Sequence, residues 1–353
     1  MLPVEGLFLM ERKVGVALVG CGRIAPIHAI ALKELPFTEI VMTMDVIRER
    51  AEAFAREYGG QPTADYQQVL ANPKVEVVQI CTPHYNHAQL ALKALEAGKH
   101  VLVEKPMALS VEDAKEMIAT AQRKGLQLGV IFQNRYNASS EAVKEAISSG
   151  ELGELRAARA FVTWHRDDEY YRFDPWRGTW AQEGGGLLIN QAIHTLDLMQ
   201  WLMGEIKTVS ANCRRWGHEF IEVEDTAEAY IRFANGALGC FYGTNCYPAN
   251  EPVFLEVLGT KGKAQIIADK AVITIGDEIR EITPESNSSS HPSYWGRGHQ
   301  TQLADFYQSL LKEEKVKIDG TEGIAAMALV LAMYASSATG AEIDFQQFIK
   351  GSH

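Results

Sequence analysis

The sequence predicts an α/β protein with two domains. The first, at residues 12–135, has a doubly wound parallel sheet, and the second, at 136–350, has a large, predominantly antiparallel open sheet. Three observations carry this prediction. Apolar runs alternate with helix-spaced stretches up to about residue 135, strand-like segments then follow one another directly, and 353 residues with 46% hydrophobic content can fill two cores.

The first half alternates strands with helices in a regular order. A run at Val14–Val19 precedes a glycine turn, and the later runs and helices continue the alternation: helix His28–Leu35, a run ending at Asp45, helix Glu49–Tyr58, run Val75–Cys81, helix Ala88–Ala97, run His100–Val103, helix Val111–Lys124 and run Leu128–Phe132. This order is typical of a parallel sheet covered by helices on both faces.

The second half changes its rhythm. A helix at Glu141–Ser149 precedes four strand-like segments, at Leu155–Trp164, Val209–Trp216, Ala227–Phe233 and Ala237–Cys246. The pair Asn235-Gly236 predicts a hairpin with a type I′ turn between the last two. A last helix is predicted at Glu322–Thr339, ending at Gly340.

Composition restricts the partners and the compartment. A net charge of -11 repels nucleic acid and anionic membranes, so we expect neither as a partner. The longest apolar stretch, 325–335, is shorter than the roughly 20 residues that span a bilayer, and predicts a buried helix. An odd set of cysteines without a C-x-x-C pair favours reduced thiols in the cytoplasm: Cys21, Cys81, Cys213, Cys240 and Cys246.

The segment Gly20–Ala25 lies between the first strand and the first helix, where a dinucleotide-binding motif belongs. Gly20 permits the turn, and Gly22 lets the backbone of Gly22, Arg23 and Ile24 approach a pyrophosphate at the helix N-terminus. Asp45 ends the second strand, and its carboxylate can accept the ribose hydroxyls of NAD while repelling the 2′-phosphate of NADP. The segment therefore predicts a Rossmann domain that binds NAD; the alternative is a plain tight turn.

Glu104-Lys105-Pro106 follows the strand His100–Val103, at the edge of the sheet where ligands bind in doubly wound folds. Proline restricts the backbone of Lys105 and so directs its side chain, and a cis bond at Pro106 is expected. Partial burial near a nicotinamide would lower the pKa of the lysine, making it an acid or base. A surface turn is the alternative.

Three glycines, Gly184–Gly186, precede a helical segment that bears Asn190, His194 and Asp197. The spacing puts these polar side chains on one helical face, and the glycines would let the chain pass close to a ligand. His194 could exchange a proton with a substrate hydroxyl, although a buried structural histidine is the alternative.

The motifs together resemble the glucose–fructose oxidoreductase / inositol dehydrogenase / rhizopine-catabolism (Gfo/Idh/MocA) family from Val14 to Gly340. The resemblance is carried by Gly20–Ala25, Cys81–His87, Ala97–Pro106, Asn134-Arg135, Trp176–Gly178 and Gly184–His194.

This resemblance implies that Lys105 and His194 are acid/base residues, converging on one cavity. It also implies a group around the cofactor: Thr82, Pro83, Asn86, His87, Glu104, Trp176 and Arg177. The expected substrate contacts are Lys105, Arg135, Trp164, His165, Tyr171, Asn190, Gln191 and His194. Much of the family has aspartate where this chain has Asn190, and an amide can orient an imidazole but cannot neutralise its charged form.

The expected reaction is hydride transfer between NAD and a secondary alcohol carbon of a sugar, cyclitol or nucleotide sugar, with no metal. Two alternatives remain: a sugar-processing enzyme that retains its cofactor, as glycosidase-like relatives with transient oxidation do, and a non-catalytic NAD(H)-binding sensor.

An aromatic and cationic set precedes the glycine run and could stack on a sugar and bind an anionic group: Trp164, His165, Arg166, Tyr170, Tyr171, Arg172, Trp176 and Arg177. An oligomer interface explains such a composition equally well. The second domain's open sheet is expected to form a homodimer or homotetramer.

Overall fold

The computed structural model describes residues 12–283 and 298–351. It divides into two compact units, one holding residues up to Phe132 together with His299–Ile324, the other holding Gln133–Gly298 and the residues from Ala325. The predicted boundary puts residues 299–324 in the second domain. The structure places this segment in the first unit because Leu303, Phe306 and Tyr307 lie in that unit's hydrophobic core.

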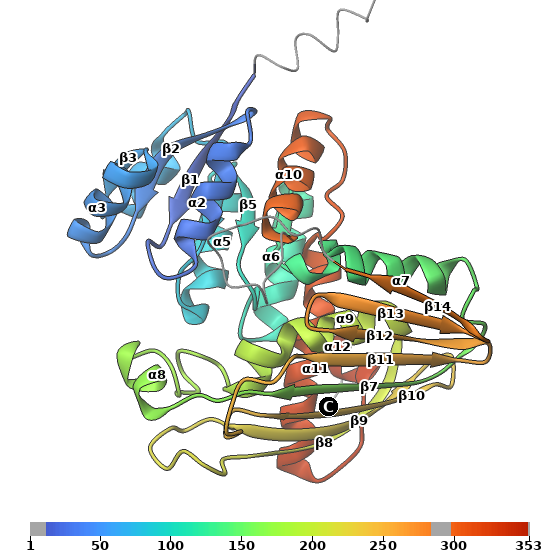
Figure 1. The fold of residues 1–353 in the computed structure, drawn as a ribbon. Coiled ribbons are helices and arrows are strands. Elements are labelled where there is room, and N and C mark those ends of the chain that lie inside the picture. Colours follow the sequence, from blue (N-terminus) through green and yellow to red (C-terminus); the bar gives the residue numbers. More distant parts are fainter. Residues whose placement is uncertain (1–11, 284–297, 352–353) are drawn as a thin grey trace, which may run out of the picture. The chain divides into compact units, whose positions relative to one another are not determined.

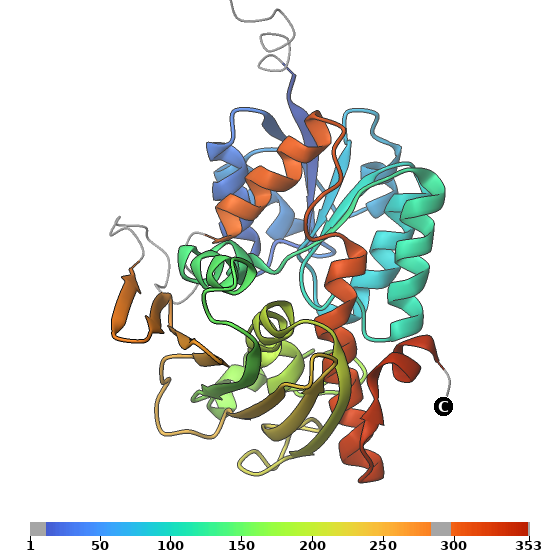
Figure 2. The same ribbon diagram turned by 90° about the vertical axis from the view of Figure 1, so that its right-hand side faces the viewer.

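The first unit is built on a six-stranded sheet in the order β3-β2-β1-β4-β5-β6, with all pairs parallel. The strands are β1 (Val14–Val19), β2 (Thr38–Met44), β3 (Gln61–Thr63), β4 (Val77–Ile80), β5 (His100–Val103) and β6 (Leu128–Val130). The helices are α2 (Ala25–Glu34), α3 (Arg48–Tyr58), α4 (Tyr66–Ala71), η1 (His84–Asn86), α5 (His87–Glu96), α6 (Val111–Lys124) and α10 (Gly298–Leu311). In Figure 2 the sheet lies between α10, in orange, and α6, in blue-green. The predicted doubly wound sheet is confirmed.

The second unit is built on a nine-stranded sheet in the order β14-β13-β12-β11-β7-β10-β9-β8-β15. Its strands are β7 (Leu155–Thr163), β8 (Ile206–Arg214), β9 (Thr226–Phe233), β10 (Leu238–Thr244), β11 (Phe254–Gly259), β12 (Gly262–Ile267), β13 (Lys270–Ile275), β14 (Glu278–Ile282) and β15 (Ile343–Asp344). The pair β7–β10 is parallel and the other pairs are antiparallel, so the predicted sheet is confirmed.

Helices cover one face of this sheet, as Figure 1 shows for α9, α11 and α12. The helical segments are η2 (Gln133–Tyr136), α7 (Ala138–Ser148), α8 (Asp168–Phe173), η3 (Leu187–Ala192), α9 (Ile193–Met203), α11 (Gly320–Thr339) and α12 (Phe345–Lys350). On the covered face, Ala158, Ala160 and Val162 of β7 are buried, whereas the alternate residues of this strand are partly or fully exposed. The sheet is therefore half-buried, with one open face.

Two details differ from the sequence prediction. Gly236 has a φ of 85° in the β9–β10 hairpin, but Asn235 is not among the residues with positive φ. The hairpin is therefore confirmed, whereas its type I′ turn is wrong. Strands β11 to β14 were not predicted, because each is only five or six residues long and gives too short an alternation to stand out.

Helix α11 is 20 residues long and apolar enough to cross a membrane by length and composition alone. Its central residues Met327, Leu329, Val330 and Met333 are fully buried in the protein. This burial matches the predicted buried helix, since a lipid-facing span would expose such side chains.

Candidate active site

The glycine turn between β1 and α2 has the geometry that a dinucleotide needs. Gly20 has a φ of 93°, and a Cβ there would lie 2.7 Å from the carbonyl carbon of Cys81, so only glycine fits. A Cβ on Gly22 would meet nothing within 4 Å. Helix α2 has no side-chain cap and no acidic residue in its first turn, which leaves its N-terminal dipole available to a phosphate group.

The Asp45 carboxylate lies at the end of β2, beside this turn. Its Oδ2 accepts a hydrogen bond from the backbone N–H of Cys21 at 3.0 Å, and its Oδ1 accepts one from Ile47 at 2.9 Å. Each oxygen keeps a further lone pair, so the carboxylate can still accept two ribose hydroxyls. The residues present therefore fit a dinucleotide, with Gly20, Gly22, Arg23, Ile24 and Asp45 as the residues that would hold it.

The loop after β4 carries Thr82, Pro83 and Asn86, and all three are half-buried. His87 is fully buried, and its Nδ1 and Nε2 lie 2.7 and 2.8 Å from the carbonyl oxygens of Pro106 and Thr82. Burial lowers the pKa of His87, although these carbonyl contacts oppose the shift. The imidazole thus connects two loops, and both ring nitrogens are engaged by backbone rather than available to a cofactor.

Glu104 follows β5 and is 6% exposed. Its Oε1 lies 2.8 Å from Nε2 of His28, and its Oε2 accepts a bond from the backbone N–H of Lys105 at 3.2 Å. Burial raises the pKa of Glu104, but hydrogen bonds from His28 and His299 outweigh burial and hold this pKa well below its usual range. Glu104 is therefore a buried carboxylate that fixes the backbone at Lys105.

The histidine partner of Glu104 is itself fixed by two further buried residues. Tyr307 donates its hydroxyl to Oε1 of Gln79, and Nε2 of Gln79 donates to Nδ1 of His28. This order of donors assigns the remaining proton of His28 to Nε2, where it faces Glu104. Lys105 is half-buried, and the Lys105-Pro106 peptide is cis, as expected.

In the second unit the segment after the glycine run is not a regular α-helix. Residues Leu187–Ala192 form a π-helix, and α9 begins at Ile193. The predicted single polar face is therefore wrong, because a π-turn changes the angular spacing between Asn190 and the later residues. Asn190 instead donates to the buried carboxylate of Glu183 and to the hydroxyl of Tyr170, at 3.5 Å.

Asp197, the last member of the predicted polar face, is fully buried in an ion pair with Arg135. The two residues share bidentate bonds, Nε to Oδ2 at 2.8 Å and Nη2 to Oδ1 at 2.6 Å. Arg135 is only 5% exposed, so the structure assigns it to this internal pair, and the predicted substrate contact is not supported. A sequence pattern cannot separate a substrate contact from an internal ion pair, because a charged residue at this position suits both roles.

The glycine run is also explained by the protein's own packing. A Cβ on Gly185 would overlap the hydroxyl of Tyr334, and one on Gly186 would overlap the carbonyl oxygen of Glu224. The Glu224 carboxylate accepts bonds from the backbone N–H groups of Gly186 and Leu188, at 2.9 and 2.8 Å. Burial raises the pKa of Glu224 to about 7, although these bonds favour the charged form. The glycine run therefore lies close to Tyr334 and Glu224, and the sequence pattern did not indicate either partner.

Arg177 lies beside the π-helix, with Nε 3.1 Å from Asp174 and Nη1 3.7 Å from Glu183. Its guanidinium stacks over the rings of Tyr170 and Trp176, at 4.4 and 4.6 Å from their centroids. Gln191 donates to the same Tyr170 hydroxyl at 2.7 Å. The structure thus brings Asn190, Gln191 and Arg177 together in one polar group around Tyr170.

Other predicted substrate contacts are used within the protein. Tyr171 is 3% exposed, and its hydroxyl accepts a bond from Asn245 at 3.0 Å, so the structure gives it a packing role. His165 is exposed, with Nδ1 3.0 Å from the carbonyl oxygen of Tyr247, and Trp164 donates Nε1–H to the carbonyl of Glu251 at 3.1 Å.

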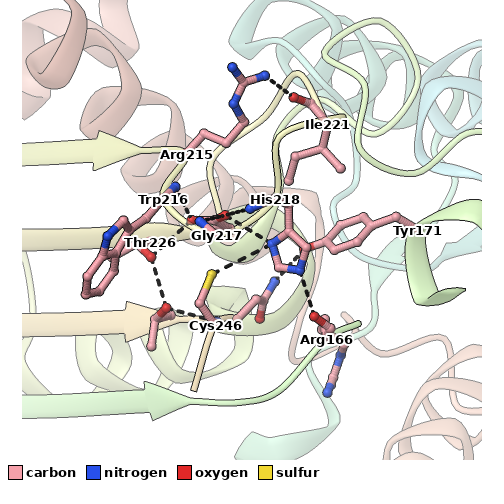
Figure 3. Close-up of polar contacts among 12 residues, drawn as sticks. Arg166, Tyr171, Arg215, Trp216, Gly217, His218, Ile221, Thr226 and Cys246 are labelled. Carbon is pink, nitrogen blue, oxygen red and sulfur yellow. Dashed lines mark hydrogen bonds and ion pairs between the residues drawn. The ribbon is translucent and has the colours of Figure 1, made fainter. Parts of the chain in front are cut away.

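Sequence patterns did not indicate His218, whose contacts are shown in Figure 3. Nδ1 of His218 is 3.0 Å from Oδ2 of Asp225, and Nε2 is 2.7 Å from the carbonyl oxygen of Arg166. Both partners are acceptors, so both ring nitrogens must carry protons. The hydrogen bond to Asp225 raises the pKa of His218 to about 10.

Lys105 belongs to the first unit and His194 to the second. Their convergence, the acid/base roles of both, and the approach of Trp176 and Arg177 to the cofactor stay predictions.

Comparison with known proteins agrees with this geometry. Residues 14–132 match the family described as "Oxidoreductase family, NAD-binding Rossmann fold", and residues 140–265 match the "GFO/IDH/MocA C-terminal domain". The chain is 30% identical over 295 residues to scyllo-inositol 2-dehydrogenase (NAD(+)) of Bacillus subtilis, covering 81% of this chain and 84% of that protein. It is 29% identical over 336 residues to 1,5-anhydro-D-fructose reductase of Ensifer adhaerens, covering 93% and 98%.

Among solved structures, the chain is similar to the WlbA dehydrogenase of Bordetella pertussis in complex with NADH and UDP-GlcNAcA. The two share 32% identity and a TM-score of 0.83, over 94% of this chain and 99% of the other. Together with the glycine turn and Asp45, these matches show that the chain belongs to the Gfo/Idh/MocA family of oxidoreductases, and that it is an NAD-dependent dehydrogenase.

Proposed function

We propose that this dehydrogenase oxidises a secondary alcohol carbon of a sugar, cyclitol or nucleotide sugar, with Lys105 and His194 as its acid/base residues. One observation carries the proposal: the buried Glu104 carboxylate accepts the backbone N–H of Lys105 and is itself held by His28. This contact fixes a lysine at the carboxyl end of β5, the edge at which doubly wound folds bind ligands.

The bound NAD supplies a hydride acceptor at its nicotinamide ring. The chain's own contribution is to remove the hydroxyl proton of the substrate, which Lys105 does with its amine or His194 with a ring nitrogen. Asn190 orients the substrate or the imidazole through its amide, since its own orientation is fixed by Glu183. Reduction of the corresponding ketone is the reverse.

The names of the relatives cover sugars, cyclitols and nucleotide sugars, and they do not single out one of these classes. Their names include an inositol dehydrogenase, an anhydrofructose reductase and a dehydrogenase bound to a nucleotide sugar. The enzyme is further proposed to be cytoplasmic, because its cysteines are free thiols.

We also propose a homodimer or homotetramer formed by the open face of the nine-stranded sheet. This face presents large apolar side chains on adjacent strands, with Tyr230 71% exposed and Leu238 51% exposed. Leu258 and Ile267 continue the same face on β11 and β12. Sedimentation of Tyr230→Glu tests the proposal: dissociation is expected, and an unchanged oligomer would locate the interface elsewhere.

The function is tested by supplying NAD and a panel of sugars, inositols and nucleotide sugars. NADH formation is followed at about 340 nm, where reduced nicotinamide absorbs. Steady NADH formation is expected with at least one of these alcohols. A single burst equal to the enzyme concentration would indicate a retained cofactor, and NADH binding without any turnover would indicate a sensor. Either result would contradict the proposal.

A further inference from the structure

We propose that Arg166 and Tyr170 form a binding site for an anionic group of the substrate, either a carboxylate or a phosphate. The inference rests on the function proposed above and narrows its substrate class to charged sugars. Three features of the second unit support the site: an arginine whose charge is not neutralised, a tyrosine hydroxyl with only donors around it, and hydrogen bonds that fix the arginine's backbone.

The Arg166 guanidinium is held in place by neutral groups. Its Nη1 donates to the carbonyl oxygen of His165 at 2.6 Å and to Oδ1 of Asn250 at 2.9 Å. Its plane lies between two aromatic rings, 4.9 Å from the centroid of Trp164 and 5.2 Å from that of Tyr170. These contacts order the side chain, which removes much of the entropic cost of binding a ligand.

Acidic residues near Arg166 are engaged elsewhere. Asp167 accepts the backbone N–H of Tyr170 as the N-cap of α8, and Asp168 pairs with Arg172 at 3.6 Å. Within residues 12–283 and 298–351, Arg166 forms no ion pair, and its Nε is buried without a hydrogen-bond partner. Neighbouring Arg177, in contrast, is paired with two carboxylates. A preordered guanidinium without a counter-ion is suited to bidentate binding of a carboxylate or phosphate.

The Tyr170 hydroxyl can donate a hydrogen bond to the same anionic group. Its oxygen is approached by Nη1 of Arg177, Nε2 of Gln191 and Nδ2 of Asn190, and all three are donors. The amide orientations are fixed independently, because Nδ2 of Asn190 also faces the Glu183 carboxylate and Oε1 of Gln191 accepts from Asn245. Burial raises the pKa of Tyr170, so the hydroxyl keeps its proton at neutral pH. That proton is available for a ligand oxygen.

The backbone of Arg166 is fixed from both sides. Its N–H donates to the carbonyl oxygen of Asn245 at 2.8 Å, and its carbonyl oxygen accepts Nε2–H of His218 at 2.7 Å. Figure 3 shows His218 between Arg166 and the turn that carries Trp216 and Gly217. Backbone N–H groups of these two residues hold the Asp225 carboxylate that pairs with His218. The arginine therefore starts from a rigid position, as a binding residue requires.

The experiment compares substrates in matched pairs, with turnover measured as NADH formation. Glucose and myo-inositol are the neutral substrates, glucuronic acid carries a carboxylate, and glucose 6-phosphate and UDP-glucose carry phosphate. The variant is Arg166→Gln, and the control is Arg156→Gln, which removes an equal charge from the start of β7, where the side chain is 62% exposed.

The expected result is a preference for charged substrates by the unchanged enzyme. Arg166→Gln should raise KM for a charged substrate roughly 10- to 100-fold, the usual range for losing a charge-assisted bond, while NADH affinity and KM for neutral substrates stay unchanged. Arg156→Gln should leave every parameter unchanged. If KM rises in Arg166→Gln only for glucuronic acid, the site binds a carboxylate. If KM rises only for the phosphate-bearing substrates, the site binds a phosphate.

Two further measurements keep the proposal testable if Arg166→Gln does not fold. Arg166→Lys keeps the charge but loses the planar fork, and should recover only part of the affinity. Inorganic phosphate or acetate should inhibit the unchanged enzyme competitively against a charged substrate. Efficient oxidation of neutral sugars without anion preference or inhibition would overturn this inference and leave the proposed function intact, whereas NADH binding with no alcohol oxidised would overturn both.

Discussion

The side-chain amide of Asn190 donates a hydrogen bond to the carboxylate of Glu183, which is 1% exposed. Much of the family has a carboxylate at the position of Asn190. Here the nearby carboxylate belongs to Glu183, seven residues earlier, and the Asn190 amide is bonded to it. Glu183 also accepts the backbone N–H of Gly178 and lies 3.7 Å from Arg177, so its charge is partly neutralised. The position where much of the family has a carboxylate therefore holds an amide whose own orientation is fixed by Glu183.

Restoring the common family residue should be unfavourable in this chain. Asn190→Asp would put a second carboxylate against Glu183, and buried like charges raise one another's pKa. We expect it to lower the free energy of unfolding by about 2–4 kcal/mol, the order of cost of an uncompensated buried charge. The double variant Asn190→Asp/Glu183→Gln restores one donor and one acceptor and should recover at least half of this loss in urea unfolding. Unchanged stability of Asn190→Asp would contradict the pairing.

The two glycines of the cofactor turn should respond differently to alanine. Gly22→Ala adds a methyl group where the structure has open space, so the fold should be kept while affinity for NAD falls by roughly tenfold, or about 1.4 kcal/mol. Gly20→Ala should instead destabilise the fold, because its φ of 93° and the Cys81 carbonyl exclude a side chain. Calorimetric titration with NADH and thermal melting separate these effects. Equal affinity in Gly22→Ala would exclude pyrophosphate from this turn.

Asp45 should determine the choice between NAD and NADP. Asp45→Ala removes the acceptor for the ribose hydroxyls and also the bond to the N–H of Cys21, so NADH affinity should fall roughly 10- to 100-fold. Discrimination against NADPH should relax, since the carboxylate no longer repels the 2′-phosphate. Tighter binding of NADPH than NADH by the unchanged protein would refute the assignment.

The His218–Asp225 pair should make stability depend on pH. The folded pKa of His218 is raised from 6.5 to about 10, so its contribution is complete below pH 6.5 and is lost as the pH rises through about 10. Hydrogen bonds from His218 and from backbone N–H groups lower the pKa of Asp225 from 3.8 despite its burial, so its contribution is lost in acid. His218→Gln should cost roughly 2–4 kcal/mol at pH 6.

Urea unfolding at pH 6, 8 and 10 measures this difference. The gap between the unchanged protein and His218→Gln should narrow at each step. Above pH 6.5 the unfolded chain releases the His218 proton that the folded protein keeps, and near pH 10 the folded protein loses it as well. A gap that is constant over this range would show that His218 is neutral in the folded protein.

Sequence patterns predict local structure and motif chemistry well in this chain. The apolar alternation predicts the parallel sheet, and the position of Asp45 after the second strand predicts its place beside the glycine turn. They do not predict which polar residues pair inside the fold. Arg135 and Asp197 are 62 positions apart, and Glu224 reaches Gly186 across 38, so their partners depend on tertiary packing. The π-helix was likewise missed, because its residues have ordinary α-helical composition.

We propose that Lys105 carries most of the proton transfer and that Asn190 only orients His194, because an amide cannot neutralise a charged imidazole. Steady-state NADH formation by Lys105→Ala and by Asn190→Ala, on the best alcohol of the panel, tests it most directly. Lys105→Ala should lower kcat by roughly 10²–10⁴-fold or more, the usual contribution of a general acid or base, and Asn190→Ala should lower kcat far less. Nearly full activity in Lys105→Ala, with activity abolished in Asn190→Ala, would contradict the assignment of the proton transfer to Lys105.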